Sequence, residues 1–188
     1  KIILKSKNTA ISKFKRLYLA PTFIKSKNDS LTLEVFTEIF GNPSTGMLFE
    51  EFVKKKKLAT SAAAYYYPDG FGHTSFVISI IPKKNIKLEE IEQNLDQYMK
   101  TLENINFDKK EVDLIKKRLV NNAIFAQDSL YMGMRIFGSS LTSGYSLDDI
   151  KDWPIKINEV SIDNLEKLMP SFFDINKSVT GYLIPISD

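Results

Sequence analysis

Residues 46–67 read GMLFEEFVKKKKLATSAAAYYY, and this stretch decides the fold. Its first half places Leu48, Phe49 and Phe52 on one side of a helix and charged residues on the other. Its second half is a run of small and aromatic residues, which is typical of a strand. The two halves meet within one or two residues near Leu58. We therefore expect an amphipathic helix that passes directly into a strand of a sheet.

The residues on both sides of this join complete a pattern of helices and strands. The predicted elements, in chain order, are a strand at 16–21, helices at 31–40 and 46–57, strands at 58–67 and 73–81, helices at 88–102, 108–137, 146–150 and 162–169, and a strand at 178–184. Helices and strands are partly segregated along the chain. This order predicts an α+β fold, with helices packed on one face of a mostly antiparallel sheet.

The chain is expected to form one domain. Its 188 residues suit a single core of ordinary size. Residues 1–15 are polar and rich in lysine, and we expect a linker or a frayed lead-in segment there. Residues 16–188 are then expected to form a single α+β domain, because no composition shift divides them.

Composition excludes several classes of function. The hydrophobic fraction of 43% is that of a globular protein. No apolar run approaches the ~18 residues that a membrane span requires, so we expect no membrane span. The 26 basic residues are nearly all lysines, and they are scattered among 23 acidic ones. Nucleic-acid readers cluster arginine instead, so we expect no nucleic-acid partner.

The sequence also lacks the side chains of a complete hydrolytic site. It has no cysteine and one histidine, His73. Zinc hydrolases generally use two or three imidazoles, so this chain cannot assemble such a site unaided. A serine nucleophile needs a histidine to activate it, and none is near Ser129 in the sequence. We therefore expect no catalytic and no metal-binding residue here, and a surface or hydrogen-bonding role for His73.

Five phrases of the sequence, in this order, resemble one known family. They are 33–41 (LEVFTEIFG), the join at 46–67, 123–129 (AIFAQDS), 141–150 (LTSGYSLDDI) with Trp153-Pro154, and 178–185 (SVTGYLIP). Together they resemble the second half-domain of the insulinase/pitrilysin family of zinc metallopeptidases. The resemblance runs from about Arg16 to Pro185.

The resemblance implies a fold and a role. Members of the family are built from half-domains of one α+β fold, and pairs of half-domains enclose a chamber that accepts peptides. The first half-domain holds zinc on an H-x-x-E-H motif, which this chain lacks. The chain therefore resembles the non-catalytic C-terminal half of a bacterial two-domain zinc metalloendopeptidase. Zinc is expected in the N-terminal half-domain of the parent protein, and this half alone is not expected to be active.

The resemblance also assigns positions at the join. In the family, the second half-domain often supplies an arginine and a tyrosine that hold the substrate, and the matching positions here are Val53 and Thr60. Neither side chain reproduces those donors, so the clamp is degenerate. Such a half-domain resembles the one that belongs to a zinc-carrying subunit. Thr60 and Tyr65 are candidate substrate-binding residues that line the chamber, although a structural role for the tyrosines at 65–67 is the stronger alternative.

The expected partners follow from the same resemblance. They are the catalytic N-terminal half-domain in cis, a homologous subunit in trans and a peptide substrate. An alternative function is a non-peptidase structural or assembly subunit of the same fold, like the family's core subunits of respiratory complexes. An H-x-x-E-H motif upstream in the parent reading frame would indicate the peptidase. A third possibility is an unrelated lysine-rich binding module. A periplasmic or secreted location is expected over a cytoplasmic one, because bacterial relatives often carry export signals.

Overall fold

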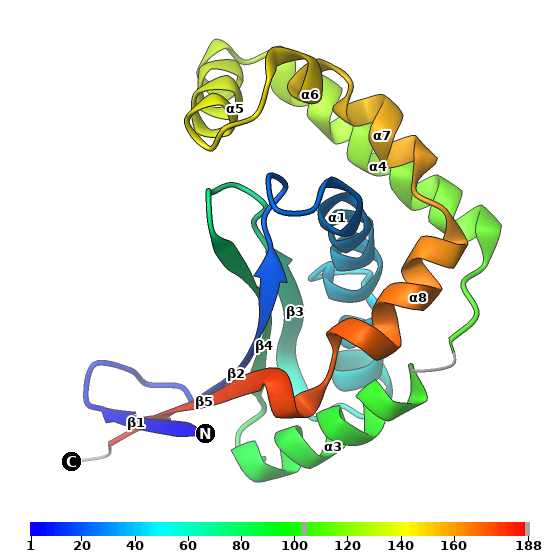
Figure 1. Cartoon of the computed structure of the whole chain (residues 1–188). Coiled ribbons are helices and arrows are strands. Elements are labelled where there is room, and N and C mark those ends of the chain that lie inside the picture. The colour runs from blue at the N-terminus through cyan, green and yellow to red at the C-terminus, as the bar shows by residue number, and fades with distance from the viewer. Residues whose placement is uncertain (103–104, 187–188) are drawn as a thin grey trace.

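A five-stranded sheet forms the centre of the protein in the computed structural model, which describes residues 1–102 and 105–186. The strand order is β1-β5-β2-β4-β3, and each neighbouring pair is antiparallel except β1 with β5. The strands are β1 Ile2–Ser6, β2 Lys13–Pro21, β3 Ala59–Tyr66, β4 His73–Pro82 and β5 Ser178–Pro185. Helices cover one face of this sheet, and the other face is open (Figure 1). The prediction of an α+β fold with helices on one face is confirmed.

The helices form two groups. Those near the sheet are α1 Lys27–Gly41, α2 Met47–Phe49, the π-helix η1 Glu50–Lys55 and α3 Leu88–Thr101. The others are α4 Lys109–Gln127, α5 Leu130–Thr142, α6 Leu147–Lys151, α7 Trp153–Glu159 and α8 Ile162–Phe172, followed by the 3-10 turn η2 Ile175–Lys177. We call the helices α4 to α8 the arch, because they run away from the sheet to α5 and return to it through α8 (Figure 1).

Small residues in β3 allow α1 to pack very close to the sheet. Ala62 and Ala64 point to the helical side and are buried. At the end of α1, a Cβ atom on Gly41 would lie 2.5 Å from Ala64 Cβ and 2.6 Å from Ala64 N. No side chain fits at that position without movement of the helix. The alanine run that marks the strand in the sequence is thus also the surface that receives α1.

The join between helix and strand is more distorted than the predicted amphipathic helix. After α2, the backbone widens into η1, where Lys56 N donates to Glu51 O at 2.9 Å, five residues earlier. Lys57 then adopts a positive φ of 57°, and Leu58 N donates to Phe52 O at 2.9 Å. These contacts turn the chain into β3 while Phe52 stays fully buried.

The segment predicted as a linker at residues 1–15 contains a strand. Ile2–Ser6 forms β1 and pairs in parallel with β5, so this part of the prediction is corrected. Ile2 and Leu4 are 64% and 59% exposed. A strand exposed on both faces shows no alternation of apolar and polar residues, and its pairing partner lies at the far end of the chain.

The long helix predicted at 108–137 is divided into two helices. α4 ends at Gln127, and Ser129 caps α5 by accepting a hydrogen bond from Met132 N at 3.3 Å. The phrase Asp128-Ser129 therefore starts a new helix, in agreement with the preference of serine for this position.

Replacing Gly41 with alanine is expected to lower the free energy of unfolding by about 1–3 kcal/mol. The new methyl group would overlap Ala64, so α1 must move away from β3. Gly133→Ala is the matched control, because nothing lies within 4 Å of a Cβ atom there. Urea denaturation measures both variants. A Gly41→Ala protein as stable as the wild type would contradict this packing.

Candidate functional site

The open face of the sheet carries an apolar row that crosses four strands. The strand registers align Val179 of β5 with Leu17 of β2, Leu17 with Val77 of β4, and Val77 with Tyr65 of β3. Val179 and Tyr65, at the two ends of this row, are 49% and 43% exposed. Beside it runs a strip of short side chains with one lysine, made of Gly181, Lys15, Ser79 and Ala63. This surface, which we call the open face, can contact a polypeptide through apolar and backbone groups.

The three tyrosines after the alanine run divide between the two faces. Tyr65 and Tyr67 are exposed, whereas Tyr66 is buried on the helical side. The Tyr66 hydroxyl donates to Pro21 O at 2.6 Å and lies 3.0 Å from Ser30 Oγ. Burial raises the pKa of Tyr66, so its phenol stays neutral. Tyr65 is therefore available for contact, and Tyr66 has a structural role.

The two positions that match the substrate clamp do not present free donors. Val53 is half-buried and packs against the core. Thr60 is exposed beside a bulge between Ala59 and Ser61, and its hydroxyl donates to Ile81 O at 3.3 Å. A hydroxyl has one proton to donate, and Thr60 uses it within the sheet. The two clamp positions thus present uncharged side chains with no free donor.

The lysine run at the join is largely neutralised by its own helix. Lys54 Nζ lies 2.6 Å from Glu50 Oε1, and Lys56 Nζ lies 3.4 Å from Glu51 Oε1. Lys56 also donates to Asn94 Oδ1 at 2.9 Å, on α3. These contacts tie the lysines to neighbouring side chains, as is typical of a solvated helix face.

Residues 1–102 and 105–186 contain no group of three or more His, Cys, Asp or Glu side chains that could hold a metal ion. His73 is exposed at the first residue of β4, opposite Pro21 of β2. Over the same residues, none of the helices is long and apolar enough to cross a membrane.

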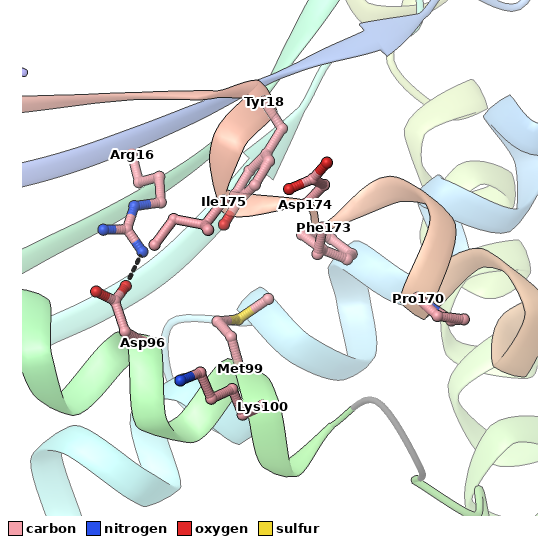
Figure 2. Close-up of a pocket in the computed structure, with 9 residues that line it drawn as sticks. All are labelled: Arg16, Tyr18, Asp96, Met99, Lys100, Pro170, Phe173, Asp174 and Ile175. Atoms are coloured by element: carbon pink, nitrogen blue, oxygen red, sulfur yellow. Dashed lines mark hydrogen bonds and ion pairs between the residues drawn. The ribbon is translucent and has the colours of Figure 1, made fainter.

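A small cavity of about 230 Å³ lies between the sheet and α3, and its walls include a buried arginine (Figure 2). Arg16 is 1% exposed, and its Nε donates to Thr180 Oγ1 at 3.1 Å. Its two other nitrogens pair with Asp96 and, at 3.2 Å, with Glu92 Oε1. Figure 2 shows the Asp96 carboxylate rising from α3 to meet the guanidinium. Each nitrogen of Arg16 thus contacts a group of the protein itself, and these contacts hold α3 on the sheet.

The charges of this network stabilise one another. Burial opposes ionisation of Glu92, but hydrogen bonds from Lys1 and Tyr182 and the charge of Arg16 keep its pKa below the ordinary value. The Tyr182 hydroxyl donates to Glu92 Oε2 at 2.6 Å. Burial also acts to lower the pKa of Arg16, but the hydrogen bond and charge of Asp96 and the interactions with Tyr18 together outweigh it and raise the pKa. The arginine therefore stays charged inside the protein, as an arginine almost always does.

A second cavity, of about 650 Å³, separates the arch from α1 and the turn after β3. Glu34 of α1 lines it and accepts a hydrogen bond from Trp153 Nε1 at 3.0 Å. Burial raises the pKa of Glu34 to about 8, although the tryptophan partly opposes the shift. Glu34 was not among the residues predicted from the sequence. In the sequence, the one indication of Glu34 is an acidic residue within the largely apolar phrase LEVFTEIF of helix α1.

Comparisons with known proteins agree with this architecture. The profile of the family described as "Peptidase M16 inactive domain" matches residues 4–119. A protease from Helicobacter pylori is similar with a TM-score of 0.86 and 19% identity, over 97% of this chain and 43% of that one. An inactive peptidase domain from Bordetella parapertussis is similar with a TM-score of 0.83 and 12% identity, over 95% of this chain and 94% of that one.

A chain of complex III2 from Candida albicans has a TM-score of 0.72 and 9% identity, over 98% of this chain and 45% of that one. Among curated proteins, none matches the sequence significantly. At these identities the structural likeness establishes the fold. This chain spans less than half of the Helicobacter protein, since the match covers 43% of it.

Replacing Arg16 with methionine is expected to lower the free energy of unfolding by about 3–5 kcal/mol, because Glu92 and Asp96 lose their buried counter-charge. Arg135→Met on α5 is the control, since Arg135 is exposed and the described residues give it no ion pair. The control should change stability by at most about 0.5 kcal/mol. Equal effects of the two changes in urea denaturation would show that the Arg16 network does not stabilise the fold.

Glu34 is expected to make stability depend on pH between about 5 and 8. In this window the folded protein keeps a proton on Glu34 that the unfolded chain releases, because the pKa rises from 4.5 to about 8 on folding. The wild type should therefore lose stability as pH rises, by at most about 1.4 kcal/mol per pH unit from this group. Glu34→Gln lacks this loss, so its stability relative to the wild type should increase from pH 5 to pH 8.

Thermal or urea unfolding at four pH values across this window measures the difference between the two proteins. Glu92 does not contribute to this difference. Because its pKa is lowered, its effect on stability is lost only as the pH falls below the ordinary pKa of a glutamate. Parallel pH profiles for the wild type and Glu34→Gln would mean that the carboxyl group is not held in its neutral form.

Proposed function

We propose, since this chain belongs to the peptidase M16 (insulinase/pitrilysin) family as its inactive domain, that it is the non-catalytic C-terminal half of a zinc-dependent metalloendopeptidase. The family match over residues 4–119 is the observation that carries this proposal. The composition is consistent with it, because a single histidine cannot supply the imidazoles of a zinc hydrolase site. Zinc would then be held by the N-terminal half-domain of the parent protein.

The open face supports a role as part of the wall of a peptide chamber. Its apolar row from Val179 to Tyr65 is partly exposed, and the strip beside it consists mainly of short side chains. Such a surface can accept many peptide sequences, because apart from Lys15 it offers contact area without charged groups that select a particular side chain. Thr60 and Tyr65, at the edge strand β3, would line this chamber.

The proposed partner in cis is the catalytic N-terminal half-domain. The Helicobacter protease is more than twice as long as the matched region, which covers 43% of it, so that protein has room for a second half-domain of similar size. A homologous subunit is proposed as the partner in trans. That subunit would supply the arginine–tyrosine pair that Val53 and Thr60 do not provide.

A structural or assembly subunit of the same fold is the second candidate. The likeness to a chain of complex III2 from Candida albicans favours it, with a TM-score of 0.72 over 98% of this chain. The two candidates differ in the partner half-domain. An H-x-x-E-H motif upstream of Lys1 in the parent reading frame supports the peptidase, and its absence from a complete upstream half-domain supports the assembly subunit.

A reconstitution experiment tests the proposed function. This chain, the N-terminal half-domain of its parent and the mixture of both are each incubated with zinc and unfolded peptides. Each sample also contains the proposed homologous subunit, which would supply the arginine–tyrosine pair. We expect peptide cleavage by the mixture and none by this chain, because the chain cannot activate water on a metal. Zinc-dependent cleavage by this chain alone would refute the assignment. Full activity of the N-terminal half without this chain would refute the proposed contribution to the chamber.

A further inference from the structure

The larger cavity is built by three parts of the chain that are distant in sequence: α1, the turn after β3, and the consecutive helices α4 to α7. It has a volume of about 650 Å³. Its lining residues come from α1, from the turn after β3, from α4 and α5, and from the segment that runs through α6 into α7: Glu34, Pro68, Asp69, Ala123, Gly133, Ile136, Phe137, Ser139, Ser140, Tyr145, Asp149, Ile150, Lys151, Trp153 and Pro154. This volume is within the range of small-ligand sites.

Glu34 and Asp149, two acidic side chains of the cavity, differ in their ion pairing. Asp149 lies 2.6 Å from Lys27 Nζ and 2.9 Å from Lys156 Nζ, so two lysines neutralise it. Among the described residues, Glu34 has no ion pair, and Trp153 Nε1 is the one side-chain group that donates a hydrogen bond to it. A covered carboxyl group is ordinarily paired with a cation. Glu34 is thus an acidic group whose positive partner is not supplied by the described part of this chain.

The rest of the cavity combines aromatic and aliphatic walls with a second acid. Ile136, Phe137 and Ile150 supply apolar surface. The ring of Tyr145 is fixed by stacking on Phe23, with centroids 4.3 Å apart and planes 9° from parallel. Asp69 is exposed at the rim, and its charge contributes to the shifts of both Glu34 and Tyr145.

We propose that this cavity binds an arginine side chain of a polypeptide, with the guanidinium held between Glu34 and Asp69 and the aliphatic stem against the apolar walls. The inference rests on the residues of the cavity and does not depend on the proposed peptidase function. A guanidinium fits better than an ammonium, because its planar fork can donate to two carboxylates at once and can stack on aromatic side chains. Phe137, which is 39% exposed at the mouth, can contact the neighbouring residues of the peptide.

The cations near Glu34 are engaged elsewhere or lie at the rim. Asp149 takes both Lys27 and Lys156 as ion-pair partners. Lys151 is exposed on α6 at the rim and is the positively charged residue among those that line the cavity. The other titratable groups close to Glu34 are phenols that burial keeps neutral, namely Tyr66 and Tyr145.

Binding should be linked to a proton on Glu34. Because the pKa of Glu34 is about 8 in the free protein, the carboxyl group must ionise to pair with a guanidinium at neutral pH. An arginine side chain does not itself titrate in this range. The affinity for arginine should therefore rise with pH up to about 8 and then level off.

The probe is an acetylated and amidated pentapeptide with arginine at its centre and alanine elsewhere. The same peptide with citrulline, which has nearly the same shape and no charge, is the matched ligand control. Trp153 is the single tryptophan of the sequence, so its indole N–H signal in NMR titrations reports directly on the cavity. We expect the arginine peptide to shift this signal and to bind at least about tenfold more tightly than the citrulline peptide. Absence of a shift with the arginine peptide at pH 8.5, or equal affinity for both peptides, would overturn the proposal.

Variants of the protein locate the interaction. Glu34→Gln keeps the shape of the side chain and should weaken binding of the arginine peptide at least about tenfold, with loss of the pH dependence. Asp69→Asn, at the exposed rim, should weaken it less and provides a second test without a change in the interior. Glu90→Gln on α3 is the control, because Glu90 is exposed and lies outside the cavity. Unchanged affinity in both Glu34→Gln and Asp69→Asn would show that the peptide binds elsewhere.

Discussion

The close approach of α1 to β3 is the constraint on which the rest of the structure depends. At Gly41 the helix backbone lies so near Ala64 that a single methyl group would overlap it. This contact fixes where α1 lies, and α1 in turn carries the groups that hold the arch. Glu38 lies 2.7 Å from Arg118 Nη2 of α4, and Glu34 accepts from Trp153 of α7. The position of the arch, and with it the larger cavity, therefore follows from the small residues of one strand.

The sheet separates a closed face from an open one. On the closed face, Arg16 pairs with α3 while alternate residues of the same strand, Phe14 and Tyr18, enter the aromatic core. A fully buried arginine with two acidic partners is costly to desolvate, so it specifies one arrangement of helix and sheet more than it adds stability. On the open face no helix covers the row from Val179 to Tyr65 (Figure 1). A domain with one uncovered sheet face is well suited to line a space shared with another domain.

The element order and the covered face could be predicted from the sequence, because they depend on local patterns. The alternation in β2 and β4 and the helical spacing of Leu88, Ile91 and Leu95 are both strong signals. Strand β1 could not be predicted, since its side chains face solvent and its pairing with β5 joins the two ends of the chain. The π-helix η1 could not be predicted from the sequence either. Leu48 and Phe52 are spaced as on an ordinary helix, and the extra residue per turn does not change that spacing.

The site was predictable only where it rested on family resemblance. Val53, Thr60 and Tyr65 were chosen by position, and the structure shows why the first two offer no free donor. Glu34 was not predicted because its position in the cavity is marked by a hydrogen bond from Trp153, which lies 119 residues later in the chain. Long-range polar contacts of this kind leave no trace in local spacing.

We propose that this chain contributes shape to a zinc enzyme and no metal chemistry of its own. The most direct test is the zinc content of the purified chain after equilibration with zinc and extensive dialysis, measured by mass spectrometry beside the same measurement on the longer parent protein. We expect stoichiometric zinc in the parent protein and none retained by this chain. Stoichiometric zinc held by this chain alone would contradict it.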